Sequence, residues 1–138
     1  MRIECWEKML DEHLSEAIKT PFEWGVYDCL VYASDWCKIV CGVDPMSESI
    51  DGVIETIRGG YKNKKEARSL IKLHRKSIRN VMDVHFEKIA VNFAQRGDIV
   101  IHKMSFGISV GRGKAMFKTE DLGMVSINLS DCEAAWRT

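Results

Sequence analysis

The spacing of apolar residues changes character near Gly97. Before that point, apolar residues recur every three or four positions, which is the period of an amphipathic helix. Beyond it they stand in short runs separated by charged or glycine-containing turns, which is typical of β-strands. The predicted helices cover residues 4–18, the stretch between Asp28 and Gly42, the stretch after Asn63 and residues 78–86, and the predicted strands cover 99–102, 106–110, 115–117 and 124–127.

Two of the predicted helices carry end signals. Asp28 is a preferred N-cap residue before an apolar helical pattern, and Gly42 suits the left-handed C′ position that ends the same helix. Asn63 is followed three positions later by Glu66, which is a polar cap with an acid in the first turn. These signals predict one helix that begins after Asp28 and another that begins after Asn63.

Helices followed by a run of strands is the order of an α+β protein with an antiparallel sheet. We therefore expect one domain over residues 1–138, in which N-terminal helices pack on a small antiparallel sheet. The helical part is expected to cover 1–95 and the sheet 96–130, with the helix of Cys29 packed against the sheet. A further short helical piece is expected near residues 52–58.

Length and composition fit one ordinary domain. The chain has 138 residues, of which 46% are hydrophobic and 29% charged, and this mixture excludes a collagen, a disordered tail and a disulfide scaffold. No apolar run approaches the ~20 residues of a membrane span. The N-terminus lacks the apolar core of a signal peptide. We therefore expect a cytosolic product without a membrane span.

The five cysteines are odd in number and include no Cys-x-x-Cys pair. Without an export signal they are expected to be reduced thiols. Cys37 and Cys41 share a helix face, but a metal site needs two further ligands at suitable spacing, which the sequence lacks. We interpret both as small buried hydrophobic residues and expect neither a metal nor a cofactor.

Charge is balanced overall but concentrated locally. Twenty Lys and Arg residues offset twenty Asp and Glu residues, so the net charge provides no argument for nucleic acid. In residues 58–79, which we call the basic segment, nine basic residues accompany one acid, Glu66. The segment is either the solvated face of a helix or a patch for an acidic partner, a cell-wall polymer or nucleic acid. Nucleic acid is disfavoured because no aromatic residue is interleaved in the helix.

The binding candidates of the basic segment share one side of the predicted helix. Helical spacing puts Leu70, Ile71 and His74 on the opposite, buried side. The candidates, all expected to be exposed, are Arg68, Lys72, Arg75 and Lys76.

Cys29 is the candidate nucleophile. It follows Asp28 in the first turn of a helix, where unpaired backbone N–H groups and the helix dipole stabilise a thiolate. The Asp28 carboxylate opposes this by like-charge repulsion. The helix start predicts a lowered thiol pKa, although a cysteine at this position is more often a packing residue.

The order of three short motifs resembles that of the NlpC-type papain-like cysteine peptidases, which cut the peptide stems of bacterial cell walls. Asp28-Cys29 opens a helix, Gly97-Asp98 leads into a strand, and residues 106–111 look like the core of the third motif. The resemblance implies a papain-like fold in which Cys29 is the nucleophile, Asp28 caps its helix and a peptidoglycan peptide is the substrate.

A second resemblance covers almost the whole chain. It is to a family of small proteins of unknown function encoded among the tail genes of tailed phages and prophages, a family similar in layout to the NlpC group. It implies a protein made in the host bacterial cytoplasm and then associated with the virion tail, with other tail proteins as partners. The matching residues are Pro21-Phe22, Trp24-Gly25, Asp28-Cys29, Ala33, Asp35, Gly42, Asp44-Pro45, Tyr61, Arg96-Gly97-Asp98, Gly107, Leu122-Gly123 and Ala135-Trp136-Arg137.

The catalytic histidine of the NlpC pattern would open the second strand, at about Ser105. A serine cannot act as a base near neutral pH, and a cysteine without a general base loses roughly 10²–10⁴-fold in rate. His102, at the end of the preceding strand, is the candidate replacement. Three hypotheses stay open: a tail tip or assembly protein on an inactive NlpC-type fold, an active cysteine amidase or peptidase that uses Cys29 and His102 on peptidoglycan peptides, and a small binding module that uses the basic segment.

Overall fold

The computed structural model describes residues 2–47, 49–50, 53–54, 57–75 and 78–138, with the backbone alone described at 49–50, 53–54 and 74–75. Its helices are α1 (Trp6–Lys19), α2 (Cys29–Cys41), α3 (Lys64–Arg75) and α4 (Ile78–His85), with short 3₁₀ segments η1 (Val91–Phe93) and η2 (Leu129–Asp131). Its strands are β1 (Ser49–Ile50), β2 (Val53–Ile54), β3 (Glu87–Ile89), β4 (Ile99–His102), β5 (Ser105–Gly111), β6 (Lys114–Thr119), β7 (Gly123–Asn128) and β8 (Ala134–Arg137). Among the described residues, no helix combines the length and the apolar character that crossing a membrane requires.

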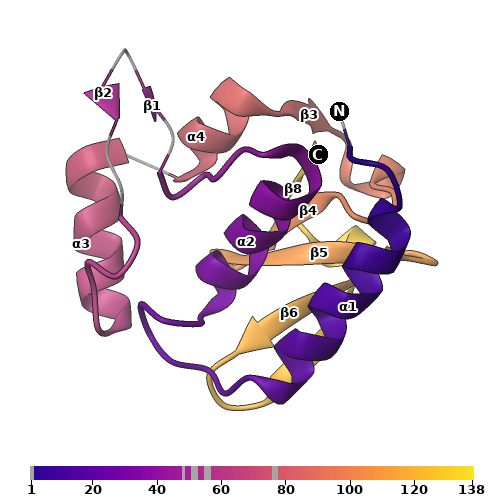
Figure 1. Cartoon of the computed structure of the whole chain (residues 1–138), viewed down its shortest axis with the longest axis horizontal. Coiled ribbons are helices and arrows are strands. Elements are labelled where there is room, and N and C mark those ends of the chain that lie inside the picture. The colour runs from indigo at the N-terminus through magenta and orange to yellow at the C-terminus, as the bar shows by residue number, and fades with distance from the viewer. Residues whose placement is uncertain (1, 48, 51–52, 55–56, 76–77) are drawn as a thin grey trace.

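The main sheet, as far as the chain is described, has six strands in the order β3-β8-β4-β5-β6-β7, and every neighbouring pair is antiparallel. β4 to β7 follow one another as a meander, and β8 brings the chain back to pair with both β3 and β4. β1 and β2 form a separate hairpin. Figure 1 shows α1 and α2 lying across one face of the sheet, whereas α3 stands to one side. The protein is therefore α+β, as the order of its elements predicts.

The strands predicted after Gly97 correspond to β4, β5, β6 and β7. The sheet nevertheless extends beyond the predicted range 96–130 at both ends, because it also contains β3 and β8. In β8, the successive residues Ala134, Ala135 and Trp136 are all buried, so the strand shows no alternation of apolar and polar positions. β3 is short and begins with two exposed charged residues, so it too lacks a strand pattern.

The helical piece predicted near residues 52–58 is wrong, since Val53–Ile54 is strand β2. Both residues are β-branched, a class that loses side-chain freedom in a helix and favours extended backbone. Over so short an apolar run, spacing alone does not distinguish a helix from a strand. Residues 52 and 55–56 of the predicted piece lie outside the described residues.

Two apolar clusters hold the layers together. The larger cluster lies between the helices and one face of the sheet, and its Trp36, Ile99 and Ile108 have no exposed surface. The smaller cluster includes Val100 and Phe117 on the other face, together with Leu129 of η2. Ile99 and Val100 are neighbours on β4 whose side chains point to opposite faces, so the middle of the sheet is buried on both sides.

The turn before β4 ties both ends of the chain to α2. The buried carboxylate of Asp98 accepts a hydrogen bond from the Arg2 guanidinium at 2.6 Å. The Gly97 carbonyl accepts bonds from Trp36 Nε1–H at 2.8 Å and from the Thr138 hydroxyl at 2.9 Å. Gly97 has a φ of 94°, and a Cβ at this position would lie 3.2 Å from the guanidinium carbon of Arg2. The positive φ therefore favours glycine here, and a side chain would also crowd the Arg2 guanidinium.

His13 gives the fold a pH dependence that can be measured. Its ring is buried under α2, where Nε2–H donates to the Tyr32 carbonyl at 2.9 Å, and burial lowers the His13 pKa. The folded protein therefore favours neutral His13, whereas the unfolded chain takes up a proton as the pH falls through about 6.5. The free energy of unfolding is expected to be constant above that pH and to fall below it, by up to about 1.4 kcal/mol for each pH unit.

Urea unfolding of the wild type and of His13→Gln at several pH values between 8 and 5 checks this expectation. The substitution removes the titrating group, so the gap between the two unfolding free energies should narrow as the pH falls. A gap that stays constant over this range would show that His13 takes up its proton equally in the folded and unfolded states.

Candidate functional site

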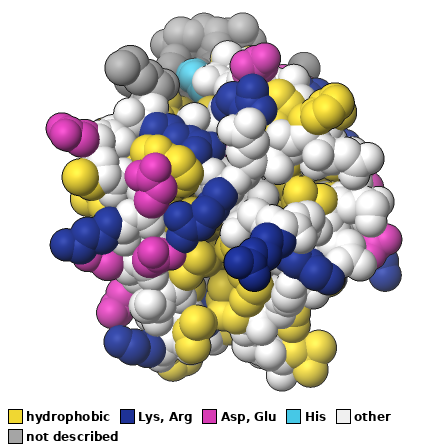
Figure 2. All heavy atoms as spheres, turned by 90° about the vertical axis from the view of Figure 1, so that its right-hand side faces the viewer, with side chains coloured by type: hydrophobic (Ala, Val, Ile, Leu, Met, Phe, Trp, Pro, Cys, Tyr) yellow, Lys and Arg dark blue, Asp and Glu magenta, His cyan; other side chains and the backbone are white. Residues whose placement is uncertain are grey.

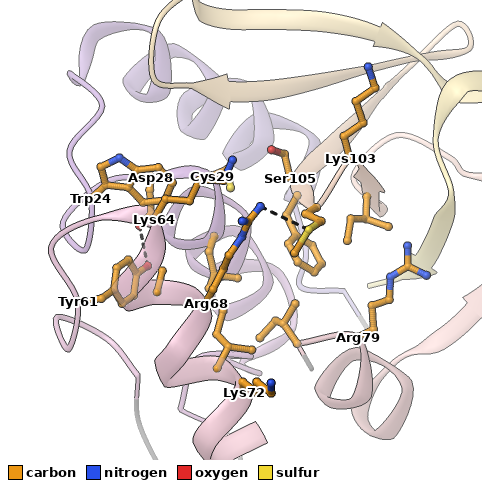
Figure 3. A pocket seen from close by; sticks show the side chains of 17 residues that line it. Trp24, Asp28, Cys29, Tyr61, Lys64, Arg68, Lys72, Arg79, Lys103 and Ser105 are labelled. Atoms are coloured by element: carbon orange, nitrogen blue, oxygen red, sulfur yellow. Dashed lines mark hydrogen bonds between the residues drawn. The ribbon is translucent and has the colours of Figure 1, made fainter. Parts of the chain in front are cut away.

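A cavity of about 440 Å³ opens beside the N-terminus of α2. It lies between α2, α3 and the turn that joins β4 to β5, as Figure 3 shows. Leu30, Ile71, Ile101 and Phe106 contribute to its apolar lining, and Cys29 stands among them. We call it the Cys29 cavity.

Asp28 organises the wall of this cavity. Its carboxylate is buried, and one oxygen accepts the Val31 backbone N–H at 2.9 Å, which is the predicted N-cap bond of α2. The other oxygen accepts the Gly25 backbone N–H at 3.0 Å and the Tyr61 hydroxyl at 2.6 Å. One side chain thus joins the helix start, the loop of residues 22–27 before it, which we call the aromatic loop, and the segment that leads to α3.

The aromatic loop is pressed against Tyr61. Gly25 has a φ of 79°, and a Cβ at this position would lie 2.0 Å from the Tyr61 carbonyl oxygen, so only glycine fits there. Trp24 stands at the rim of the cavity, edge-to-face against Phe22 with ring centroids 5.0 Å apart. Its Nε1–H donates to the Glu120 carboxylate at 2.8 Å, which fixes the indole in place.

Cys29 occupies the predicted position in the first turn of α2, and its thiol meets the Ser105 side chain and the Phe106 backbone. Burial raises the pKa of this thiol, and the Asp28 carboxylate raises it further, against hydrogen bonds from Phe106 and Ser105 that lower it. The predicted lowering of the Cys29 pKa is therefore wrong. The cost of removing a thiolate from water outweighs the stabilisation by the helix start.

The structure does not bring the candidate base to the candidate nucleophile. The Nδ1–H of His102 donates to the Asp131 carbonyl at 2.8 Å, and the ring stands edge-on to Phe117 with centroids 6.2 Å apart. Phe117 belongs to the smaller cluster, on the face of the sheet away from α2. Among the described side chains that line the Cys29 cavity there is no histidine, and Ser105 lies beside the thiol instead. The His74 side chain lies outside the described residues.

The basic segment divides into residues with different surroundings. Arg58 is held by the carboxylates of Asp44 and Asp35, at 2.6 and 2.8 Å. Arg68 and Lys72 are exposed as predicted, and both line the Cys29 cavity. The other two binding candidates, the Arg75 side chain and Lys76, lie outside the described residues.

Among the described residues, five basic side chains line the Cys29 cavity, and they come from different elements. Asp28 is the single acid among the described lining residues, and its oxygens are already bonded within the protein. The sequence pattern missed Lys64 as a site residue, although its four-residue spacing to Arg68 was a usable signal. Lys103 could not be predicted as a site residue from the sequence, because it reaches the cavity only through the tight β4–β5 turn. The five are Lys64, Arg68, Lys72, Arg79 and Lys103.

The other cysteines singled out by the sequence, Cys37 and Cys41, lie in the apolar interior. Cys37 is buried in the larger cluster, and Cys41 is partly buried against it. Both are free thiols, as are the other three cysteines. Within the described part of the chain, no group of three or more His, Cys, Asp or Glu residues is arranged to hold a metal ion.

Fold and site together define a small α+β protein in which a cysteine at a helix start lies against an antiparallel sheet, beside a cavity lined by basic residues. The chain belongs to the family described as Domain of unknown function (DUF6950), whose model matches residues 1–138. A comparison with the curated proteins finds no match.

The bonds of Asp28 predict a graded loss of stability. Asp28→Ala removes an N-cap and leaves buried donors without partners, so it should lower the free energy of unfolding by about 2–4 kcal/mol. Tyr61→Phe removes one of the same bonds and should cost about 1 kcal/mol. Denaturant unfolding of both variants measures the difference. Equal losses in the two variants would contradict the central position of the carboxylate.

The raised pKa of Cys29 predicts slow alkylation. In the folded protein, the rate of Cys29 labelling by iodoacetamide should rise with a midpoint above the free-thiol value of about 8.5. Ser105→Ala removes a hydrogen bond to the sulfur and should move the midpoint higher still. Peptide mass spectrometry resolves each thiol, with the exposed Cys5 as the internal reference for reagent access. Fast labelling of Cys29 at neutral pH would show that its thiolate is stabilised.

Proposed function

We propose that this chain is a tail-associated protein of a phage or prophage, built on an NlpC-type cysteine peptidase fold that does not hydrolyse peptides. Two features support the fold assignment: a helix that begins at Asp28-Cys29, and an antiparallel sheet entered through Gly97-Asp98 and packed against that helix. The tail association rests on the sequence resemblance to small proteins encoded among phage tail genes.

The observation that carries the proposal is the pairing of Cys29 with Ser105. A cysteine nucleophile needs a neighbouring base or a lowered pKa, because the thiolate is the reactive form. Here the neighbour is a hydroxyl, which cannot take the proton near neutral pH, and burial raises the pKa of the thiol. Both effects keep the sulfur protonated, so the arrangement favours packing over attack on a carbonyl.

Two acidic residues of the motifs, Asp28 and Asp98, stabilise the fold through contacts that do not involve hydrolysis. Asp28 caps α2 and bonds the loop at Gly25, while Asp98 binds Arg2 at the turn before β4. A fold that keeps these residues, with no base at the thiol among the described side chains, is suited to serve as a scaffold for binding. The function that follows is recognition of another tail component at the tail tip or during assembly.

An active cysteine peptidase or amidase is the second candidate. The observation that favours it is the position of Cys29, at a helix N-terminus and on the wall of a cavity large enough to take a side chain. Its substrate would be a peptidoglycan peptide. This function requires a base, and His102 would have to leave its contacts with Asp131 and Phe117 to supply one.

A phage or prophage that encodes this chain provides the test. Deleting the gene should abolish infectious particles, whereas Cys29→Ser, which removes the thiol and keeps a side chain of similar size, should leave the titre unchanged. The chain should be present in purified tails by mass spectrometry. Absence of the chain from tails, with normal particles after deletion, would contradict the tail assignment.

The same proteins separate the two candidates. Purified wild-type chain incubated with host peptidoglycan should release no soluble peptides and create no new amino groups. Release that disappears in both Cys29→Ser and His102→Ala would establish the peptidase instead.

A further inference from the structure

We propose that the Cys29 cavity binds an acidic segment of a partner protein, with an apolar side chain of that segment inside the cavity and its carboxylates on the surrounding basic residues. The proposal rests on the proposed function, because it names the chemistry of the partner that a non-hydrolytic cavity would recognise. It is carried by the placement of charge and apolar surface around one opening.

Three elements bring positive charge to the same opening. Lys64, Arg68 and Lys72 follow one another at four-residue spacing on α3, so they share one helix face, and all three line the cavity. Figure 3 shows Lys103 across the cavity from α3. Arg79, at the start of α4, lies below Lys103 in the same view. Four of the five belong to the basic segment, and the fold adds Lys103 from the β4–β5 turn to the same opening.

The charge of Lys64, Arg68, Lys72 and Lys103 is not offset by the other described residues that line the cavity. Asp28 is the one acidic residue among the described lining residues, and its oxygens accept three hydrogen bonds from the protein. Arg68 reaches across the opening to Met104, with a nitrogen-to-sulfur distance of 3.6 Å, which leaves its positive charge without a carboxylate in that contact. On the side of the molecule turned away from α3, by contrast, acidic and basic side chains both occur (Figure 2).

Below the charged opening the cavity is apolar. Leu30, Ile101 and Phe106 are buried core residues, whereas Ile71 and Ile78 are partly buried. Met104 stands at the opening with 65% of its surface exposed. An apolar side chain that entered here would lose contact with water, while flanking carboxylates would lie among Lys and Arg side chains.

This combination favours an acidic peptide over a nucleic acid strand. A single strand is held by aromatic platforms on which bases stack. Of the aromatic residues that line the cavity, Tyr61 and Phe106 are each only 3% exposed, and Trp24 is fixed against Phe22 and Glu120. The floor of the cavity thus exposes almost no aromatic surface, and Trp24 at its rim is a single aromatic residue rather than a series of stacking platforms. An apolar floor among basic residues matches an aliphatic side chain between carboxylates.

The chain also contains basic residues that can serve as a matched control for those that line the cavity. Lys62 and Lys65 belong to the same basic segment and are exposed, but neither lines the Cys29 cavity. Lys65 borders a shallow depression on the other side of α3, with Leu73. Neutralising this pair removes as much charge from the segment as neutralising Arg68 and Lys72, without touching the cavity.

Fluorescence anisotropy with defined peptides tests the proposal. The probe is a labelled peptide of repeated Glu-Leu-Glu units, and the comparison peptides repeat Gln-Leu-Gln and Glu-Ser-Glu. The wild type should bind Glu-Leu-Glu most tightly, since only this peptide has both the carboxylates and the apolar side chain. Arg68→Gln/Lys72→Gln should weaken binding about tenfold or more, and Lys62→Gln/Lys65→Gln should leave it nearly unchanged. Added salt should weaken binding by the unmodified protein.

Several results would overturn the proposal. Equal weakening by the two double variants would mean that the general charge of α3, not the cavity, attracts the peptide. Equal binding of Glu-Ser-Glu would remove the role of the apolar floor, and tighter binding of an oligothymidine strand would assign the site to nucleic acid. A chain that binds no peptide but still assembles into tails without hydrolysis would refute this inference and leave the proposed function intact. Hydrolysis of peptidoglycan would refute the proposed function whatever the peptide result.

Discussion

The carboxylate of Asp28 is the interaction on which the site depends. It is buried and accepts hydrogen bonds from a helix start, from the aromatic loop and from the hydroxyl of Tyr61. Of the groups that it joins, Tyr61 lines the Cys29 cavity together with Asp28 itself. The bond to Tyr61 holds this residue, and with it the start of α3, against the helix that packs on the sheet. A buried carboxylate with three donors is stabilising only while all three are in place, so it couples the local geometry of separate segments.

Cys29 shows that a position at a helix start does not by itself lower the pKa of a thiol. A helix N-terminus favours negative charge, but its effect is of the order of 1 kcal/mol and weakens rapidly with distance. Burial against Ser105 and Phe106 disfavours the same charge, and so does the neighbouring carboxylate of Asp28. The balance raises the pKa of the thiol at this junction of helix and sheet.

The basic residues of the basic segment differ in what surrounds them in the folded protein. Arg58 is committed to Asp44 and Asp35, where it holds the segment after α2 against that helix. Lys64, Arg68 and Lys72 lie along one face of α3 and line the Cys29 cavity, whereas Lys65 lies on another. A stretch that looks uniform in the sequence therefore contains residues with different surroundings: an ion-paired arginine, residues that line the cavity and residues that lie away from it.

Local signals in the sequence determined much of the helical part and the meander. Asp28 and Gly42 bound α2 because cap preferences act over a few residues, and apolar runs after Gly97 mark β4 to β7 because their turns are short. β8 escaped detection because burial on both faces of the sheet removes alternation from Ala134-Ala135-Trp136. The site depended on more distant contacts still. Sequence placed Cys29 at a helix start, and the NlpC resemblance placed Ser105 at the position of the base. Only the tertiary structure directed His102 to Asp131 and brought Lys103 opposite α3, because such contacts depend on strand register and packing rather than on local preference.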